Sequence, residues 1–156
     1  MTSKTLTLRL YNYLYATHYP IVPNSYIYDW ESDLLAINKV NGYITEYEIK
    51  ISRGDFKNDF KKEKKHKLIS DCHEYKFESK LIPNYFYYVT PPGLIDKKEL
   101  PEYAGLIEIG VMKPRIVKKA PKLHKIKAFD ADIRIEYNLL RKLYYKFWTM
   151  FNEKNK

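Results

Sequence analysis

Two acidic residues and a lysine stand at positions where their side chains could support metal-assisted chemistry. Asp33 opens the apolar segment 34–37, and Glu48 and Lys50 close the next apolar segment along the chain. Carboxylates hold hard divalent cations, and Mg²⁺ needs only one or two of them, because waters and a substrate phosphate complete its octahedron. A lysine beside such an ion orients the attacking water or stabilises the charge that develops on the phosphate. These residue types fit hydrolysis of a phosphodiester bond.

The segment 33–50 is predicted to form one β-hairpin that brings these side chains together. Asn41-Gly42 between two apolar runs is typical of a two-residue type I′ turn, whose central residues both take positive φ. With that turn Asp33 pairs with Lys50, and Glu48 lies diagonally about 7–8 Å from Asp33. Side chains alternate along a strand, so one face is apolar and belongs to the core: Leu34, Ala36, Tyr47, Ile49 and Ile51. The other face carries the chemistry: Asp33, Glu46, Glu48 and Lys50.

An ordinary strand surface is the alternative interpretation of these residues. A Glu-x-Lys triplet is common in a chain that is 30% charged, and an exposed Asp33–Lys50 pair contributes only about 0.2–1 kcal/mol. The functional interpretation is favoured by the acid at the start of the first strand and by the basic helix expected directly after Lys50. Asp29 and Glu31 precede Asp33 at two-residue spacing and are alternative ligands, but Asp33 is preferred because it opens the apolar run.

The segment 32–50 resembles the bipartite motif of the PD-(D/E)xK nuclease superfamily, which has the restriction-endonuclease-like fold. The dipeptide SD, fourteen intervening residues and the tripeptide EIK stand where that motif has its two halves. The continuation 52–56 and the lysine-rich stretch after it are similar to small single-domain bacterial and phage members. The resemblance covers about residues 25–110.

By this resemblance, Asp33 and Glu48 are the metal ligands and Lys50 is the catalytic lysine. The carbonyl group of Ile49 is expected as a third ligand, and Mg²⁺ is the expected cofactor, with Mn²⁺ as a substitute. The sequence departs from the motif at Ser32, where proline is frequent. Some members supply a further acid from a helix before the hairpin, whereas residues 1–24 contain no Asp or Glu.

Length and composition indicate one domain with a partner of negative charge. The chain has 156 residues, 45% of them hydrophobic, which suffices for a single core. A net charge of +9 predicts binding to a polyanion, here DNA with RNA left open, although a membrane surface would attract the same charge. The sequence contains no apolar run of 18 residues, so it predicts no membrane span. The single cysteine, Cys72, cannot form an internal disulfide, and no secretory signal is evident, so we expect a reducing cytoplasm.

Periodicity and turn residues predict a single domain over 1–156, with a core at about 1–112, a basic arm at 113–129 and a C-terminal helix at 130–152. The other predicted elements are a helix at 3–18, a strand at 25–30, the hairpin, a helix at 54–72 capped by Ser52, and strands at 84–90 and 106–112. This order predicts an α/β fold, on the borderline of α+β, in which helices flank a central mixed sheet. It is compatible with the αβββαβ core of the nuclease superfamily.

The helix after Lys50 is predicted to contact phosphate groups, because lysines greatly outnumber acids on it. The expected nucleic-acid-binding residues are Ser52, Arg53, Lys57, Lys61, Lys62 and Lys65. A solvated helix, in which Asp59 and Glu63 pair with lysines one turn away, is the alternative. The tyrosines of the strand 84–90 could stack on bases, but core packing is the favoured interpretation.

The C-terminal helix, with Asp130 or Asp132 as its cap, carries an apolar stripe that docks on its own domain or forms a homodimer seam. Its members are Ile133, Tyr137, Leu140, Tyr144, Phe147 and Phe151. The leading hypothesis for the whole chain is a magnesium-dependent DNA endonuclease of DNA repair, recombination or phage DNA metabolism. The alternatives are a non-catalytic nucleic-acid-binding protein on the same fold, and an interaction protein that assembles through this stripe.

Overall fold

The sheet at the centre of the structure is open, mixed and six-stranded. The structure is a computed structural model and describes residues 1–130 and 135–154. The strands lie in sequence order: β1 (His18–Ser25), β2 (Ser32–Asn38), β3 (Ile44–Ile49), β4 (Tyr85–Thr90), β5 (Ala104–Glu108) and β6 (Arg115–Lys118). The pairs β1–β2, β2–β3 and β5–β6 are antiparallel, whereas β3, β4 and β5 run parallel. The predicted α/β class with a mixed sheet is confirmed.

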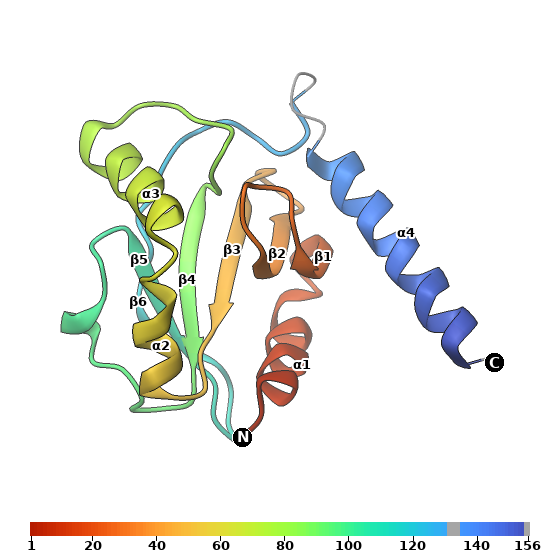
Figure 1. The fold of residues 1–156 in the computed structure, drawn as a ribbon, viewed down its shortest axis with the longest axis horizontal. Helices are drawn as coiled ribbons and strands as arrows, with labels where there is room; N and C mark the ends of the chain where they lie inside the picture. The colour runs from red at the N-terminus through yellow and green to blue at the C-terminus, as the bar shows by residue number, and fades with distance from the viewer. Residues whose placement is uncertain (131–134, 155–156) are drawn as a thin grey trace.

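Helices cover both faces of the sheet (Figure 1). On one face lies α1 (Ser3–Leu14), and on the other lie α2 (Arg53–Asp59) and α3 (Glu63–Tyr75). The α1 leucines, Leu6, Leu10 and Leu14, pack in one core with the apolar side chains of β2 and β3 predicted to share a face: Leu34, Ala36, Tyr47 and Ile49. Ile51 is 42% exposed, contrary to the prediction, because β3 ends at Ile49.

The turn between β2 and β3 differs from the predicted one. The Asn38 side chain accepts hydrogen bonds from the N–H groups of Val40 and Asn41, and the Gly42 N–H donates to the Asn38 carbonyl. This side-chain capping favours a four-residue turn. Gly42 has a φ of +72°, but Asn41 is not in the left-handed region, so the type I′ turn was a wrong prediction.

The longer turn shifts the register of the hairpin by two residues. Leu34 pairs with Tyr47 and Leu35 with Glu46, so Asp33 comes opposite Glu48 and not Lys50. Because side chains alternate with a period of two, this shift leaves every residue on its predicted face. The two carboxylates are therefore closer partners than the predicted register implied.

The first strand lies earlier than predicted, at His18–Ser25 and not at 25–30. Asn24 takes a φ of +46°, and Ser25 already pairs with Ser32, so the chain turns directly after Ser25. β1 contains Pro20 and Pro23, which an edge strand tolerates because one side of its backbone has no ladder to complete.

Three further elements have different bounds from those expected. The helix predicted at 3–18 ends at Leu14, and the one predicted at 54–72 is divided into α2 and α3 by a turn at 60–62. The strand predicted at 106–112 is β5, and the predicted basic arm contributes β6, which pairs with β5. The side chain of Ser52 accepts the Asp55 N–H, so the predicted cap of α2 is confirmed.

The C-terminal helix, α4 (Ile135–Lys154), contacts β1 at its start and then extends past this edge of the sheet (Figure 1). Its buried residues are Ile135 and Leu139. Most of the predicted stripe is exposed, including Tyr137, Tyr144 and Phe147, so docking on its own domain is limited to the first turns. The predicted cap Asp132 and the stripe residue Ile133 lie outside the described residues. Within 1–130 and 135–154, no helix has the length and apolarity needed to cross a membrane.

Candidate active site

The structure brings Asp33, Glu48 and Lys50 to one end of the sheet, where β2 begins and β3 ends. Lys50 Nζ lies 3.0 Å from Glu48 Oε2. The Asp33 carboxylate accepts the N–H of Ile49 at 2.8 Å, which holds it beside the last residues of β3. The three residues singled out by spacing therefore form one group in space.

Two further elements complete an ion network around Glu48. Lys50 Nζ also lies 3.1 Å from Oδ1 of Asp59, the last residue of α2. Lys62, in the turn between the two helices, bridges the same two carboxylates at 3.2 Å from Asp59 and 3.5 Å from Glu48. Lys65 of α3 contacts Glu48 as well. The turn at 60–62 is therefore what places lysines over β3.

The network continues inward from Glu48 along β3. Lys65 Nζ lies 2.8 Å from Oε1 of Glu46, whose carboxylate also accepts the indole N–H of Trp30 at 3.0 Å. The same ammonium group lies 4.8 Å from the ring centroid of Phe86. Three carboxylates thus face three ammonium groups, and this balance is what allows such charges to be buried.

Asp59 is held by two further groups in the core. The Tyr88 hydroxyl donates to Asp59 Oδ2 at 2.9 Å, and His66 Nε2 lies 3.1 Å from the same oxygen. The other ring nitrogen of His66 lies 2.6 Å from the Tyr103 hydroxyl. These contacts tie α2 and α3 to β4, so the positions of the charged groups are set by the core.

Nearby ammonium groups offset the burial of Glu48, whereas desolvation raises the pKa of the fully buried Glu46. Burial works to raise the pKa of Glu48, but the ammonium groups of Lys65, Lys50 and Lys62 outweigh it and lower that pKa. Burial likewise opposes the charge of Lys50, yet Glu48 and Asp59 raise its pKa above the ordinary value. The pKa of Lys65 is raised in the same way by Glu46 and Glu48. Lys50 is therefore a fixed positive charge at neutral pH.

Asp33 stands apart from this balance. Burial, and then the negative charge of Glu48, raise its pKa to about 6. Among residues 1–130 and 135–154 it has no ion-pair partner within 4.0 Å, in contrast to Glu48. Asp33 also lines a hollow of about 310 Å³ together with Ile49 and the residues Ser3, Lys4 and Thr7 of α1. A cation bound in this hollow would provide the ionised Asp33 carboxylate with a positively charged partner.

The donor groups fit a magnesium ion with few protein ligands. Asp33 and Glu48 are carboxylates on adjacent strands, and Mg²⁺ takes one or two such groups with waters and phosphate. Within the described parts of the chain, no three His, Cys, Asp or Glu side chains form a group that could hold a metal. Ammonium groups contact both oxygens of Glu48, so a metal there competes with Lys50, Lys62 and Lys65.

The predicted nucleic-acid-binding residues differ in exposure and in ion pairing. Three are exposed: Ser52 at the N-cap of α2, Lys57 on the helix, and Lys61 after it. Arg53 is also exposed but pairs with Glu99 at 2.5 Å. Lys62 is partly exposed, whereas Lys65 is buried between Glu46 and Glu48. Lys65 is therefore not a surface contact for phosphate, because its ammonium group is needed to neutralise β3.

The alternative ligands Asp29 and Glu31 each have another partner. Asp29 is exposed and pairs with Lys64 at 3.0 Å, and Glu31 accepts the Tyr26 hydroxyl at 3.0 Å. Asp33, in contrast, is held at the end of β3 by the Ile49 N–H.

Sequence reasoning did not identify Asp59 as part of the site, assigned Lys65 to phosphate contacts, and gave Glu46 no role beyond its strand face. Glu46 had been placed on the same strand face as Glu48, and three ionisable residues alternating on one strand were the available signal. Asp59 had been assigned to a solvated helix face. Its contact with Lys50 depends on the turn that ends α2, which the lysine-rich sequence does not indicate.

Comparison with known proteins supports the fold. No protein-family model matches the chain, and no curated protein matches it. A solved structure, the SPO1766 protein of unknown function from Silicibacter pomeroyi, is similar over 100% of this chain and 93% of its own, with a TM-score of 0.65 and 17% sequence identity. At this identity the likeness concerns the fold alone.

Proposed function

We propose that this protein is a magnesium-dependent DNA endonuclease. The observation that carries the proposal is the meeting of the Asp33 carboxylate, which forms no ion pair with any described residue, with the Glu48–Lys50 pair, beside a hollow that Asp33 lines. A buried network without a chemical role has no need of a carboxylate whose charge is left uncompensated. The resemblance of the segment 32–50 to the PD-(D/E)xK motif points to the same activity.

In this proposal Asp33 and Glu48 hold the ion, with the Ile49 carbonyl as a further ligand. When bound, the ion activates a water molecule and neutralises charge on the phosphate. Lys50 acts as a positive charge and not as a base, because Glu48 and Asp59 raise its pKa. Its ammonium group, held by two carboxylates, is pre-positioned to stabilise the negative charge of the transition state. The exposed Lys57 and Lys61 bind the phosphates of the DNA backbone.

A non-catalytic nucleic-acid-binding protein is the second candidate. The observation in its favour is that Glu48 is fully buried and both its oxygens contact ammonium groups. If Glu48 is closed to a metal ion in this way, the protein would not cleave DNA, and its net charge of +9 would serve nucleic-acid binding alone.

The decisive experiment is incubation of supercoiled plasmid and of branched, duplex and single-stranded oligonucleotides with Mg²⁺ or Mn²⁺, with chelator as the control. The proposal expects cleavage that the chelator stops. Asp33→Asn and Lys50→Met should each lower the cleavage rate by about 100-fold or more, since each removes a charge aimed at the reacting group. Asp29→Asn is the matched control, an exposed acid four residues before Asp33, and should cut like the parent.

Binding separates the two candidates. Fluorescence anisotropy in chelator should give similar DNA affinities for the parent, Asp33→Asn and Lys50→Met. Binding that depends on salt, with no cleavage of any substrate under either metal, would favour the non-catalytic candidate. Cleavage by Asp33→Asn at the parent rate would refute the site assignment.

A further inference from the structure

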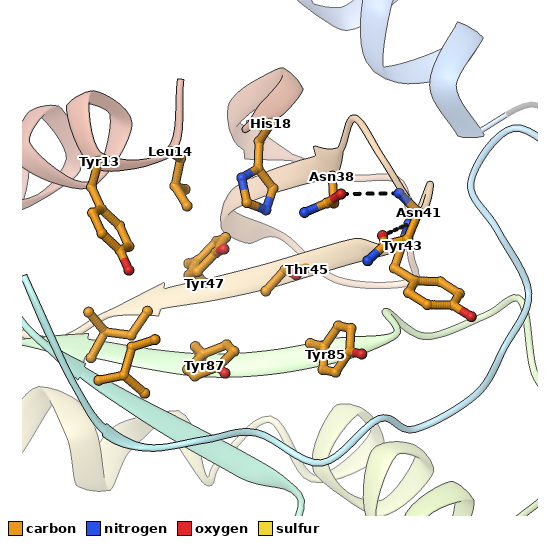
Figure 2. Close-up of a pocket in the computed structure, with 12 residues that line it drawn as sticks. Tyr13, Leu14, His18, Asn38, Asn41, Tyr43, Thr45, Tyr47, Tyr85 and Tyr87 are labelled. Atoms are coloured by element: carbon orange, nitrogen blue, oxygen red, sulfur yellow. Dashed lines mark hydrogen bonds between the residues drawn. The ribbon is translucent and has the colours of Figure 1, made fainter. Parts of the chain in front are cut away.

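A hollow lined by five tyrosines lies on the α1 side of the sheet (Figure 2). We call it the tyrosine hollow, and its tyrosines are Tyr13, Tyr43, Tyr47, Tyr85 and Tyr87. Its volume is about 270 Å³. This hollow is separate from the candidate active site. Most tyrosines of β3 and β4 line it.

The hollow exists because α1 is shorter than the sheet face that it covers. α1 ends at Leu14, so the part of the face beyond its C-terminal end is left to the tyrosines. Strand alternation in β4 sends Tyr85 and Tyr87 to this face, whereas Phe86 and Tyr88 enter the opposite core. The aromatic run of β4, which suggested core packing, therefore contributes both to the core and to the tyrosine hollow.

Glycine in β5 lets one ring lie across the neighbouring strand. Tyr87 pairs with Gly105, and a Cβ at Gly105 would lie 2.3 Å from Tyr87 Cε1 and 2.6 Å from the Ala120 backbone nitrogen. The Tyr87 ring therefore occupies the space that any other residue at position 105 would fill. It lies beside the ring of Tyr47, its partner on β3, with centroids 6.0 Å apart and planes only 21° from parallel.

Further aromatic rings border this pair. Tyr43 and Tyr85 meet edge to face with centroids 6.1 Å apart. Tyr13 is 42% exposed at the end of α1, and Tyr43 and Tyr85 are half-buried, so all three present ring surface to solvent. The tyrosine rings thus provide aromatic surfaces on which a planar ring system could stack.

Polar groups at the rim favour a ligand with acceptor atoms and negative charge. The side-chain oxygens of Asn38 and Asn41 accept N–H groups of the turn, which leaves their amide nitrogens turned toward the hollow (Figure 2). Lys122 Nζ lies 4.5 Å from the centroid of the Tyr43 ring. Lys39 follows Asn38 in the same turn, and its ammonium group, which keeps its charge, donates to the carbonyl groups of Tyr15 and Ala16. In the described residues no acid lines the hollow.

We propose that the tyrosine hollow binds an unpaired nucleobase of a single-stranded nucleic acid. Tyrosine rings stack on any base, because every base has a π-face, and each such contact contributes strongly to affinity. The two amide groups donate to base carbonyl or ring nitrogen atoms, and Lys39 and Lys122 attract the flanking phosphates.

The tyrosine hollow and the hollow beside Asp33 lie at opposite ends of α1. Lys4 lines the hollow beside Asp33, and Tyr13 lines the tyrosine hollow. Nine residues of helix separate them by about 14 Å, at about 1.5 Å per residue. One strand can therefore reach both places, a link that rests on the proposed nuclease function, whereas base binding itself does not.

The test is the anisotropy of a labelled twelve-residue oligothymidylate, measured in chelator so that cleavage plays no part. The double variant Tyr43→Ala/Tyr85→Ala should bind at least about 5-fold more weakly, and up to about 100-fold, because stacking is lost. Tyr13→Ala, which removes an exposed ring, should weaken binding in the same direction. Tyr85→Phe keeps the ring and should stay within about 2-fold of the parent. Tyr75→Ala, an exposed tyrosine of α3, is the matched control.

Three companion ligands distinguish the possible occupants. An abasic strand of the same length should bind the parent more weakly and should not respond to the double variant. A duplex should also be insensitive to it. Thymidine monophosphate that binds as tightly as the strand would show a free nucleotide site and overturn the proposal.

Two results would refute base binding outright. One is equal affinity of the parent for the thymidylate and abasic strands. The other is a double variant that changes oligomeric state by light scattering without changing affinity, which would make the tyrosine hollow an interface between copies. Lost cleavage with unchanged strand binding would concern the proposed nuclease and not this inference.

Discussion

Replacing Asp33 by asparagine should stabilise the metal-free protein while it removes the proposed activity. Asp33 is partly buried near Glu48, and both effects raise its pKa to about 6. Its ionised form is therefore unfavourable in the folded state. Asparagine removes the charge and keeps a side-chain oxygen that can accept the Ile49 N–H.

The size of the effect follows from the pKa. Raising the pKa of a carboxyl group from 3.8 to about 6 corresponds to about 3 kcal/mol, at about 1.4 kcal/mol per pKa unit. Solvent screens part of this, because the side chain is only partly buried, so we expect a gain of about 1–2 kcal/mol in the free energy of unfolding at pH 7.

The pH dependence of the gain has a definite sign. Above about pH 6 Asp33 is ionised in both the folded and the unfolded parent, so the full difference between parent and variant is present. As the pH falls from about 6 to about 4, the folded parent takes up its proton first and recovers the lost stability. Below about pH 4 Asp33 is neutral in both states, so the unfolding free energies of parent and variant should change with pH in the same way.

Urea unfolding followed by circular dichroism in chelator, at pH 7.5, 5 and 3.5, measures this difference. Asp29→Asn is the control, because the Asp29 side chain is 73% exposed and should change stability by less than about 0.5 kcal/mol. A variant that is less stable than the parent at pH 7.5 would refute the reasoning, as would a difference that does not shrink in acid.

Two substitutions test the packing that supports each site. Lys65→Met should cost about 3–5 kcal/mol of unfolding free energy, because the buried Glu48 loses a compensating charge; the exposed neighbour Lys64→Met should cost less than about 0.5 kcal/mol in the same titration. Gly105→Ala should lower stability by about 1–3 kcal/mol, because the added carbon overlaps a ring and a backbone nitrogen. Gly54→Ala, with no atom closer than 3.9 Å, should not; thermal melts showing equal losses for both would contradict the packing argument.

The face assignments of the hairpin were predictable from the sequence, but its register was not. Alternation of apolar and charged residues survives a shift of two positions, so Glu48 was placed on the correct strand face, although its cross-strand partner and the turn were not predicted correctly. The turn depends on Asn38, whose side chain competes for two backbone N–H groups. Asn41-Gly42 carries a strong local preference, and this side-chain contact overrides it.

The tertiary part of the site lay beyond sequence reasoning for a related reason. Lysine spacing suggests a solvated helix, because lysines rarely enter a core without partners. Lys65 enters because β3 presents Glu46 and Glu48 on the covered face of the sheet. Which lysine of the run becomes buried depends on where α2 stops, and no residue type at 60–62 signals that stop.

The equal numbers of carboxylate and ammonium groups in the cluster around Glu48 have a consequence for how the protein meets a partner. Since that cluster is electrically neutral, it contributes nothing to the net charge of +9, which therefore belongs to the remainder of the molecule. Fields from such outer charges reach about one Debye length, about 8 Å at physiological ionic strength, and speed diffusional capture of a polyanion. Substitutions in the cluster that keep this balance should therefore leave the speed of first encounter unchanged.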